Sequence, residues 1–320
     1  MSIVLPKNTS FDNVELFTNY TYSNNILKLN NLKDIYKNSE EYYLIINDII
    51  NADITDIIKS DIINNFLNDI NTIELGLILI EELCKKKNIY ESYLISYLPK
   101  VLLLASDKTS INIKIQAHIT GKEIINIANI NATDKIQEYL FEGIANTNWQ
   151  TKILSLELLG LYSDKSTIPF SKKLYDVMPV ITNSMWDTKK EVKEISKKTA
   201  LSVMNTCQNN DIKNLIPIIV DTIENPEKVS ETLHKLSSTV FVQSVDNPTL
   251  SIIVPILLRG CQEKKIESKR RVCVIADNMC KLIDYPHDAA TFLPELKPLI
   301  IRLRSEEHTS ELQSPCNLVC

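Results

Sequence analysis

The sequence predicts an all-α protein built as a solenoid of stacked helix pairs. Five glycines and twelve prolines in 320 residues suit helices and disfavour sheets joined by tight hairpins. From about residue 61, apolar residues recur with the period of an α-helix. A proline preceded by apolar residues also recurs, at spacings of 38, 38 and 39 residues. Its positions are Pro179, Pro217, Pro255 and Pro294.

This spacing is typical of one repeat family. A helical period near 40 residues with two helices per unit is the pattern of HEAT and armadillo repeats. One such pair cannot bury its apolar face alone, so it needs neighbours of the same kind. Upstream, Tyr97-Leu98-Pro99 lies 80 residues before Pro179, which is two periods. The alternative is an ordinary helical bundle with chance prolines, which the even spacing disfavours.

The predicted helices follow the apolar pattern and the polar turns between its segments. We expect pairs at 61–70 and 73–87, 92–105 and 111–128, 134–146 and 149–162, 171–185 and 188–206, 211–224 and 227–245, and 249–261 and 266–283, with a last helix from about residue 288. The recurring prolines are expected within the first helix of each pair. There each would remove one backbone hydrogen bond and bend the helix.

Three segments are predicted along the chain. Residues 1–60 are expected to form an N-terminal cap that is partly disordered. Residues 61–303 are expected to form one continuous HEAT-repeat solenoid. Residues 304–320 have neither the period nor the composition of the preceding repeats, so we expect an unstructured tail. This tail looks like translated sequencing-adapter sequence and is interpreted as artefactual; the alternative is a genuine disordered tail.

One predicted turn carries a family resemblance. Residues 185–193, Met-Trp-Asp-Thr-Lys-Lys-Glu-Val-Lys, resemble the most recognisable segment in the HEAT domain of translation elongation factor 3, the fungal-type ribosome-dependent ATPase. Within it, Trp186 and Asp187 close the first helix, and Trp186 is interpreted as a residue that packs the turn. Later repeats resemble the same family, so the resemblance spans about 145–301. Between 61 and 144 it lies only in the period.

The resemblance implies a function for a longer protein. In that family the HEAT repeats bind the ribosome, and two ATP-binding cassettes use ATP hydrolysis to promote release of tRNA from the exit site. None of the five glycines begins the P-loop sequence that such a cassette requires. We therefore expect this chain to be no enzyme and to bind no cofactor, with ATP bound in the missing cassettes. The alternative is a protein-interaction scaffold, such as the HEAT-repeat activator of the amino-acid-starvation kinase.

Two basic clusters are the candidate contacts with ribosomal RNA. They lie in the predicted helices 188–206 and 266–283, and a regular solenoid would place them on one ridge about 20 Å apart. Cations on such a ridge bind phosphates without reading bases. The candidate residues are Lys189, Lys190, Lys193, Lys197, Lys269, Arg270 and Arg271. The alternative is a solvated helix face whose cations pair with nearby glutamates.

Charge, cysteines and hydropathy describe the expected surroundings. A net charge of −5 argues against a general nucleic-acid coat and still permits a local basic face. No two of the seven cysteines have Cys-x-x-Cys spacing, so we expect reduced thiols, no metal site and a cytoplasmic location. The sequence contains no stretch of 18 uncharged apolar residues, so it predicts no membrane-spanning helix. The family resemblance implies ribosomal RNA and ribosomal proteins as partners, and we expect them to be bound by a monomer, with no membrane and no small-molecule substrate.

Overall fold

The computed structural model describes residues 62–69, 72–86 and 91–312. Every regular element in these ranges is a helix, which confirms the predicted all-α class of stacked helix pairs. The chain falls into two compact units, one ending at Asn129 and the other beginning at Ile130. The predicted cap at 1–60 lies outside the described residues. The single domain predicted over 61–303 stays a prediction, because each unit is described by itself.

The first unit is a stack of helices around a leucine and isoleucine core. It holds α4 (Ile62–Asn68), α5 (Ile73–Lys86), α6 (Glu91–Ile95), α7 (Leu98–Leu104) and α8 (Ile111–Ile127). Helix α5 packs against α4 and α8, and α7 packs against α8. The core side chains Leu77, Ile80 and Ile124 are fully buried. They lie on the inward faces that the 3.6-residue period predicts.

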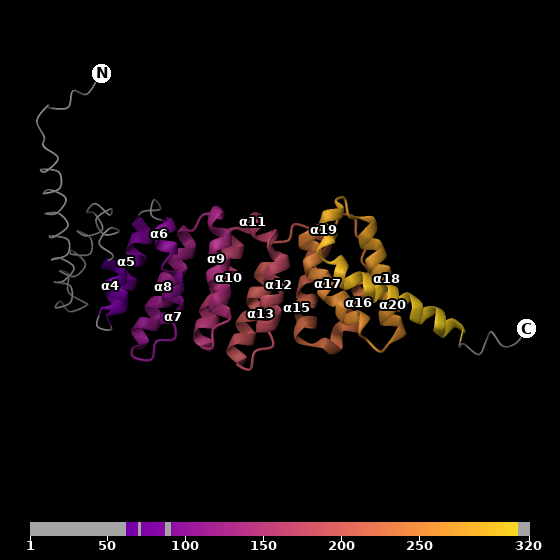
Figure 1. Ribbon diagram of the computed structural model, residues 1–320, viewed down its shortest axis with the longest axis horizontal. Coiled ribbons are helices and arrows are strands. Elements are labelled where there is room, and N and C mark those ends of the chain that lie inside the picture. Colours follow the sequence, from indigo (N-terminus) through magenta and orange to yellow (C-terminus); the bar gives the residue numbers. More distant parts are fainter. Residues whose placement is uncertain (1–61, 70–71, 87–90, 313–320) are drawn as a thin grey trace, which may run out of the picture. The chain divides into compact units, whose positions relative to one another are not determined.

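The second unit contains the proline-bearing repeats. Its helices are α9 (Thr133–Ile144), α10 (Trp149–Lys165), α11 (Thr167–Ser171), α12 (Leu174–Ser184), α13 (Lys190–Met204), α14 (Asn210–Lys213), α15 (Ile216–Glu224), α16 (Val229–Ser238), α17 (Asn247–Cys261), α18 (Ile266–Lys281), α19 (Pro286–Ala290) and α20 (Leu293–Leu312). Short 3₁₀ turns at Ile130–Ala132 and Pro226–Lys228 precede α9 and α16. Within this unit, the turns joining α9 to α10, α12 to α13, α15 to α16 and α17 to α18 lie along one edge (Figure 1).

In each unit, a buried threonine on the second helix of one pair bonds to the second helix of the preceding pair. Thr120 on α8 donates its hydroxyl to the Leu77 carbonyl at 3.0 Å. Thr199 on α13 donates to the Leu156 carbonyl on α10 at 2.8 Å. In each case the partner lies 43 residues earlier in the chain. A short β-branched donor satisfies its own hydrogen-bonding group while letting two helices approach closely.

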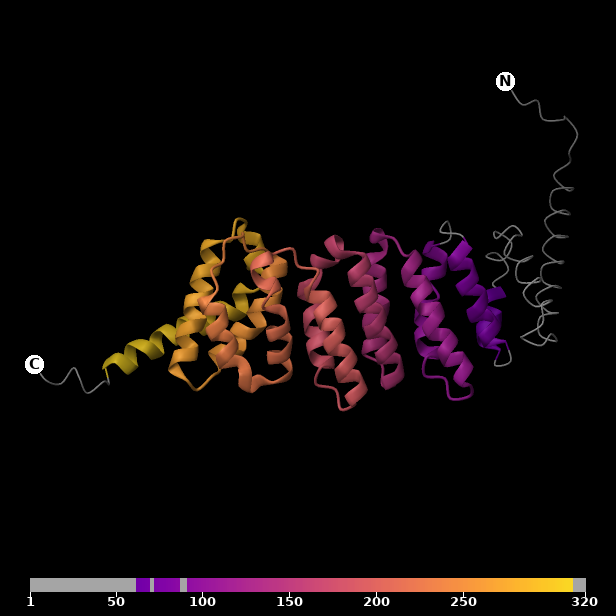
Figure 2. The same cartoon turned by 180° about the vertical axis from the view of Figure 1, so that it is seen from behind.

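The pair α15–α16 departs from the regular stacking that the period predicts. Helix α15 packs against α13 and α17, while α16 packs against α17 and α18. Both helices of this pair therefore lie beside the second helices, α13 and α18. As a result α17 comes into direct contact with α12, and the two first helices become neighbours. The view from behind shows the same stack from the other side (Figure 2).

Helix α16 also ends earlier than predicted. It stops at Ser238, whereas the sequence predicted a helix over 227–245. The chain beyond it bonds to another element instead of continuing the helix. Asp211 accepts hydrogen bonds from the backbone N–H groups of Val242 and Gln243 at 2.7 and 2.8 Å. These bonds satisfy the donors that a helix would otherwise have used, so the tertiary contact replaces the last two turns.

The recurring prolines do not all occupy helix interiors. Pro179 lies inside α12 and Pro255 inside α17, as predicted. Pro99, Pro217 and Pro294 are each the second residue of a helix, because a turn separates that helix from a short one before it. The first-turn N–H groups of a helix have no internal partner, so proline costs no hydrogen bond there. The predicted bend is therefore wrong at these three positions.

The last helix runs further than expected. Helix α20 reaches Leu312, so the backbone of residues 304–312 is helical where an unstructured tail was predicted. No glycine or proline interrupts residues 299–312, which permits this continuation. The rest of the predicted tail, 313–320, lies outside the described residues. In the described part of the chain, no helix has the length and apolar content to cross a bilayer.

Candidate nucleic-acid interface

Asp187 lies in the turn between α12 and α13 and connects it to α10. Its carboxylate accepts a hydrogen bond from Lys152 Nζ at 2.6 Å and another from the backbone N–H of Lys189 at 2.9 Å. The hydrogen bond from Lys152, together with that N–H, holds the pKa of Asp187 below its ordinary value of 3.8. The side chain of Asp187 is only 13 % exposed. Asp187 therefore positions the start of α13.

Trp186 lies beside Asp187 and remains half exposed, at 51 %. The guanidinium carbon of Arg259 lies 6.0 Å from the centre of its ring, at the limit of a cation–π contact. Arg259 also donates to the carbonyl of Ile223 at 3.2 Å, at the end of α15. Partial burial lowers the pKa of Arg259. Trp186 thus approaches α17 and stays half exposed, and its role in packing the turn stays a prediction.

Lys152 and Arg259 were not among the residues that the sequence singled out. Each lies on a different helix from the group that it binds, so local spacing does not reveal the contact. One signal was available for Lys152, which precedes Asp187 by 35 residues, close to one repeat period. Equivalent positions in successive repeats lie side by side, so this separation marks a candidate pair.

The first basic cluster covers the outer side of α13. Val192, Thr199 and Val203 are buried on its inner side. Lys189, Lys190 and Lys193 are exposed, and these three residues are named the lysine ridge below. Lys190 lies 3.6 Å from Glu194, but both side chains are largely exposed, at 86 % and 62 %. Such an exposed ion pair contributes little free energy, so an anion can still reach the lysine ridge.

Lys197 belongs to the packing of the unit rather than to the lysine ridge. Its Nζ lies 2.6 Å from Glu224 Oε2 at the end of α15. Residues 189–198 contain five lysines and two glutamates, a local charge of 5 − 2 = +3. Glu224 lowers the effective positive charge near Lys197. The phosphate contact predicted on α13 stays a prediction, and of its four lysines Lys197 is the one that pairs with Glu224.

The second cluster on α18 lies apart from the first. Arg271 is only 23 % exposed, forms an ion pair with Glu267 and donates to the Ser230 carbonyl at 3.4 Å, which ties α18 to α16. Lys269 is half-buried, and Arg270 is exposed. Helices α15 and α16 both lie between α13 and α18. Two helices thus intervene between the clusters, and their placement on one ridge about 20 Å apart stays a prediction.

No disulfide joins the cysteines of the described residues. Cys84, Cys207 and Cys261 are buried. Burial raises the pKa of Cys84 to about 12 and that of Cys261 to about 11, which keeps both thiols protonated near neutral pH. Across residues 62–69, 72–86 and 91–312, no three His, Cys, Asp or Glu side chains are grouped as a metal site would require.

Comparison with known families identifies the repeats. A model described as the elongation factor 3 N-terminal HEAT repeat matches residues 42–200. A model described as the elongation factor 3/GNC1 HEAT repeat matches residues 227–318. The first match includes part of the predicted cap and the whole segment 61–144. In that segment the sequence resembled the family only in its period. The repeats of this family therefore extend further toward the N-terminus than the motif at residues 185–193 indicated.

Individual relatives agree with the family models. The chain is 36 % identical over 228 residues to elongation factor 3 of Pneumocystis carinii, covering 71 % of this chain and 22 % of that protein. It is 40 % identical over 209 residues to elongation factor 3 of Phytophthora infestans, covering 65 % of this chain and 20 % of that protein. Elongation factor 3B of Saccharomyces cerevisiae is 36 % identical over 209 residues, 65 % of this chain and 20 % of that protein. The chain spans about a fifth of the length of these relatives.

Proposed function

The chain belongs to the elongation factor 3 family of HEAT-repeat proteins, and from this we propose that it is the ribosome-binding repeat portion of a translation factor. The observation that carries the proposal is the lysine ridge, which combines the family's turn motif with three exposed cations. Ribosomal RNA offers phosphates at regular spacing, and exposed lysines bind them without reading sequence. The lysine ridge is the first candidate contact, and Lys269 and Arg270 form a second.

The activity of the longer protein is part of the same proposal. Its cassettes would hydrolyse ATP and promote release of tRNA from the exit site, while the HEAT repeats hold the factor on the ribosome. We propose no catalysis and no cofactor for the repeats themselves. The partners are ribosomal RNA and ribosomal proteins in the cytoplasm, bound by a monomer. The family match supports this division of labour, because both matching models describe HEAT repeats.

Ribosome co-sedimentation at low and moderate salt tests the proposal. The test variant changes Lys189, Lys190 and Lys193 to Glu together and leaves the Lys197–Glu224 pair intact. If the three lysines contact phosphates, the wild-type affinity falls steeply with salt, and removing them lowers the slope of log K against log salt by about 2–3. The variant should therefore lose most of its binding at low salt.

A matched control keeps the change in net charge the same. Lys122 and Lys297 on other helices and Lys108 in the loop before α8 are exposed lysines, and their joint change to Glu also alters the charge by −6. This control should keep its salt dependence if the lysine ridge is the contact. Equal losses in both triple variants would mean that net charge alone drives binding. Intact binding by the lysine ridge variant would refute the proposed contact.

A protein-interaction scaffold remains the second candidate. The family description that matches residues 227–318 names GNC1 together with elongation factor 3, so these repeats alone do not separate the two. The sequence of the full transcript separates them, since a P-loop after the repeats supports the translation factor. Further HEAT repeats in its place would support the activator of the amino-acid-starvation kinase.

A further inference from the structure

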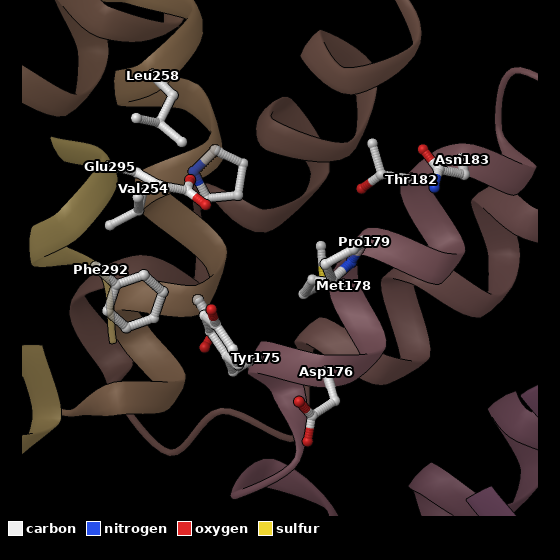
Figure 3. Close-up of a pocket in the computed structure, with 12 residues that line it drawn as sticks. Tyr175, Asp176, Met178, Pro179, Thr182, Asn183, Val254, Leu258, Phe292 and Glu295 are labelled. Carbon is white, nitrogen blue, oxygen red and sulfur yellow. The ribbon is translucent and has the colours of Figure 1, made fainter. Parts of the chain in front are cut away.

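A groove of about 450 Å³ opens between α12 and α17 in the second unit. Met178 and Pro179 line it from α12, while Val254, Pro255 and Leu258 line it from α17. Tyr175 and Phe292 stand at one end, in edge-to-face contact with ring centres 5.3 Å apart. Figure 3 shows these side chains facing the space between the two helices. The groove is thus apolar between its walls and has an aromatic end.

The groove results from the irregular pair described above. In a regular stack, the first helix of the pair α15–α16 would lie between α12 and α17. Here α15 packs against α13 instead, so α12 and α17 face each other directly. Their side chains meet over part of this face and leave the groove open along the rest. The groove therefore follows from the packing of α12 against α17.

Each of the two prolines removes one backbone hydrogen-bond donor from a wall of the groove. A proline inside a helix has no N–H, so the carbonyl four residues earlier lacks its usual donor. For Pro179 this carbonyl belongs to Tyr175, and for Pro255 it belongs to Ser251. Both residues line the groove. Each wall therefore has one helix carbonyl whose usual intrahelical donor is absent.

The charge of the groove has one sign. Its two ionisable acids, Asp176 and Glu295, are exposed, and neither forms an ion pair within the described chain. The lining contains no lysine, arginine or histidine. Figure 3 places these two carboxylates on opposite sides of the groove, Asp176 on the α12 side and Glu295 beside α17. The field of these carboxylates repels phosphate and attracts a cation.

We propose that this groove binds a cationic peptide segment of a protein partner, with an apolar side chain between the prolines and lysine or arginine beside the two carboxylates. The wall from Tyr175 to Asn183 is about 12 Å long at 1.5 Å per helical residue. An extended peptide of three to four residues spans that length. The site is separate from the phosphate contact proposed for α13, since it lies between first helices and has the opposite charge.

Fluorescence anisotropy with a labelled peptide, Lys-Leu-Lys-Leu-Lys-Leu-Lys, tests the proposal on the whole chain. We expect a dissociation constant on the order of 10–100 μM, as befits a small interface. The double variant Asp176→Asn, Glu295→Gln keeps the shape and removes both charges, so binding should weaken about tenfold. The variant Thr182→Arg places a bulky cation in the lining and should abolish binding.

Matched variants and peptides separate this site from general attraction. Glu142 and Asp164 are exposed acids outside the groove in the same unit, so Glu142→Gln with Asp164→Asn should leave binding within twofold. A peptide with serine in place of leucine should bind at least fivefold more weakly. The proposal is wrong if the groove variant binds like the wild type, if the serine peptide binds equally well, or if a uridine decamer displaces the peptide. None of these outcomes depends on ribosome binding.

Discussion

Two successive helix pairs in the second unit share a sequence frame and pack differently. Pro179 and Pro217 follow the same apolar frame, 38 residues apart. In α12 the proline is internal, and its pair partner α13 packs closely against α10 of the preceding repeat. In α15 the proline is the second residue, and this shorter helix packs against α13. Equal spacing in sequence therefore does not guarantee equal packing.

The turns after the two prolines differ in the same way. Asp187 lies eight residues after Pro179 and bonds to Lys152 in the preceding repeat. Asn225 lies eight residues after Pro217, and its side chain bonds to Asp221 on its own helix at 3.0 Å. The regular pair is thus fastened to its neighbour through the turn. The irregular pair instead contacts α13 through the solvent-exposed ion pair between Lys197 and Glu224.

The largest expected effect comes from Gly260, which lies where α17 meets α16 and α18. A Cβ there would lie 2.6 Å from Leu233 Cδ1 and 2.6 Å from Val272 Cγ2. Both neighbours are buried, so Gly260→Ala must displace packed side chains and should lower the free energy of unfolding by about 2 kcal/mol. Urea unfolding followed by tryptophan fluorescence measures this, because Trp149 and Trp186 are the two tryptophans of the chain. No loss of stability would mean that α16 packs less closely than described.

A smaller loss is expected at Asp187. Asp187→Ala removes the acceptor for Lys152 and for the N–H of Lys189, so unfolding should become easier by about 1–2 kcal/mol. Asn225→Ala is the matched change in the irregular pair and should cost about 0.5 kcal/mol or less, because Asn225 bonds within its own helix. Similar losses at both turns would remove the distinction drawn between the pairs.

The same turn predicts a dependence on pH. The folded pKa of Asp187 lies below its ordinary value of 3.8, so its contribution to stability is present above that value. The contribution is lost as pH falls through the lowered folded pKa. Asp187→Asn should therefore flatten the acid side of the stability profile below about pH 4. Urea midpoints measured from pH 6 to pH 3 test this, and parallel profiles would contradict it.

Gly160 is expected to respond in the opposite direction to Gly260. It lies on α10 where that helix meets α13, and an added Cβ would lie 3.7 Å from its nearest neighbours, in ordinary contact. Gly160→Ala should raise stability by about 0.5–1 kcal/mol, because alanine loses less backbone entropy in a helix. Tryptophan-monitored urea unfolding again gives the answer. A loss of stability in Gly160→Ala would show that α10 and α13 pack more closely than described.

The smallest effect is expected at Lys197. Its side chain and that of Glu224 are 42 % and 39 % exposed, so solvent screens their attraction. Lys197→Met keeps the aliphatic stem and should change the free energy of unfolding by no more than about 0.5 kcal/mol. A loss above 1 kcal/mol would mean that this pair holds α15 against α13. High salt should then reproduce part of the loss in the wild type.

The sequence by itself determined the helices, the repeat period, the family and the surface of α13. An apolar residue every three to four positions defines a buried face, which is why Val192 and Val203 were placed correctly. The same pattern correctly left Lys189 and Lys193 on the exposed side. Most predicted helix boundaries also lie within a few residues of those observed.

Only the tertiary structure decided which helix covers each buried face. Periodicity is a local property, and it is the same whether α15 lies beside α12 or beside α13. The choice depends on contacts between residues far apart in sequence, such as Asp211 with Val242 and Lys152 with Asp187. In the packing that results, α16 ends at Ser238, α15 and α16 lie between the two basic clusters, and a groove is open between α12 and α17.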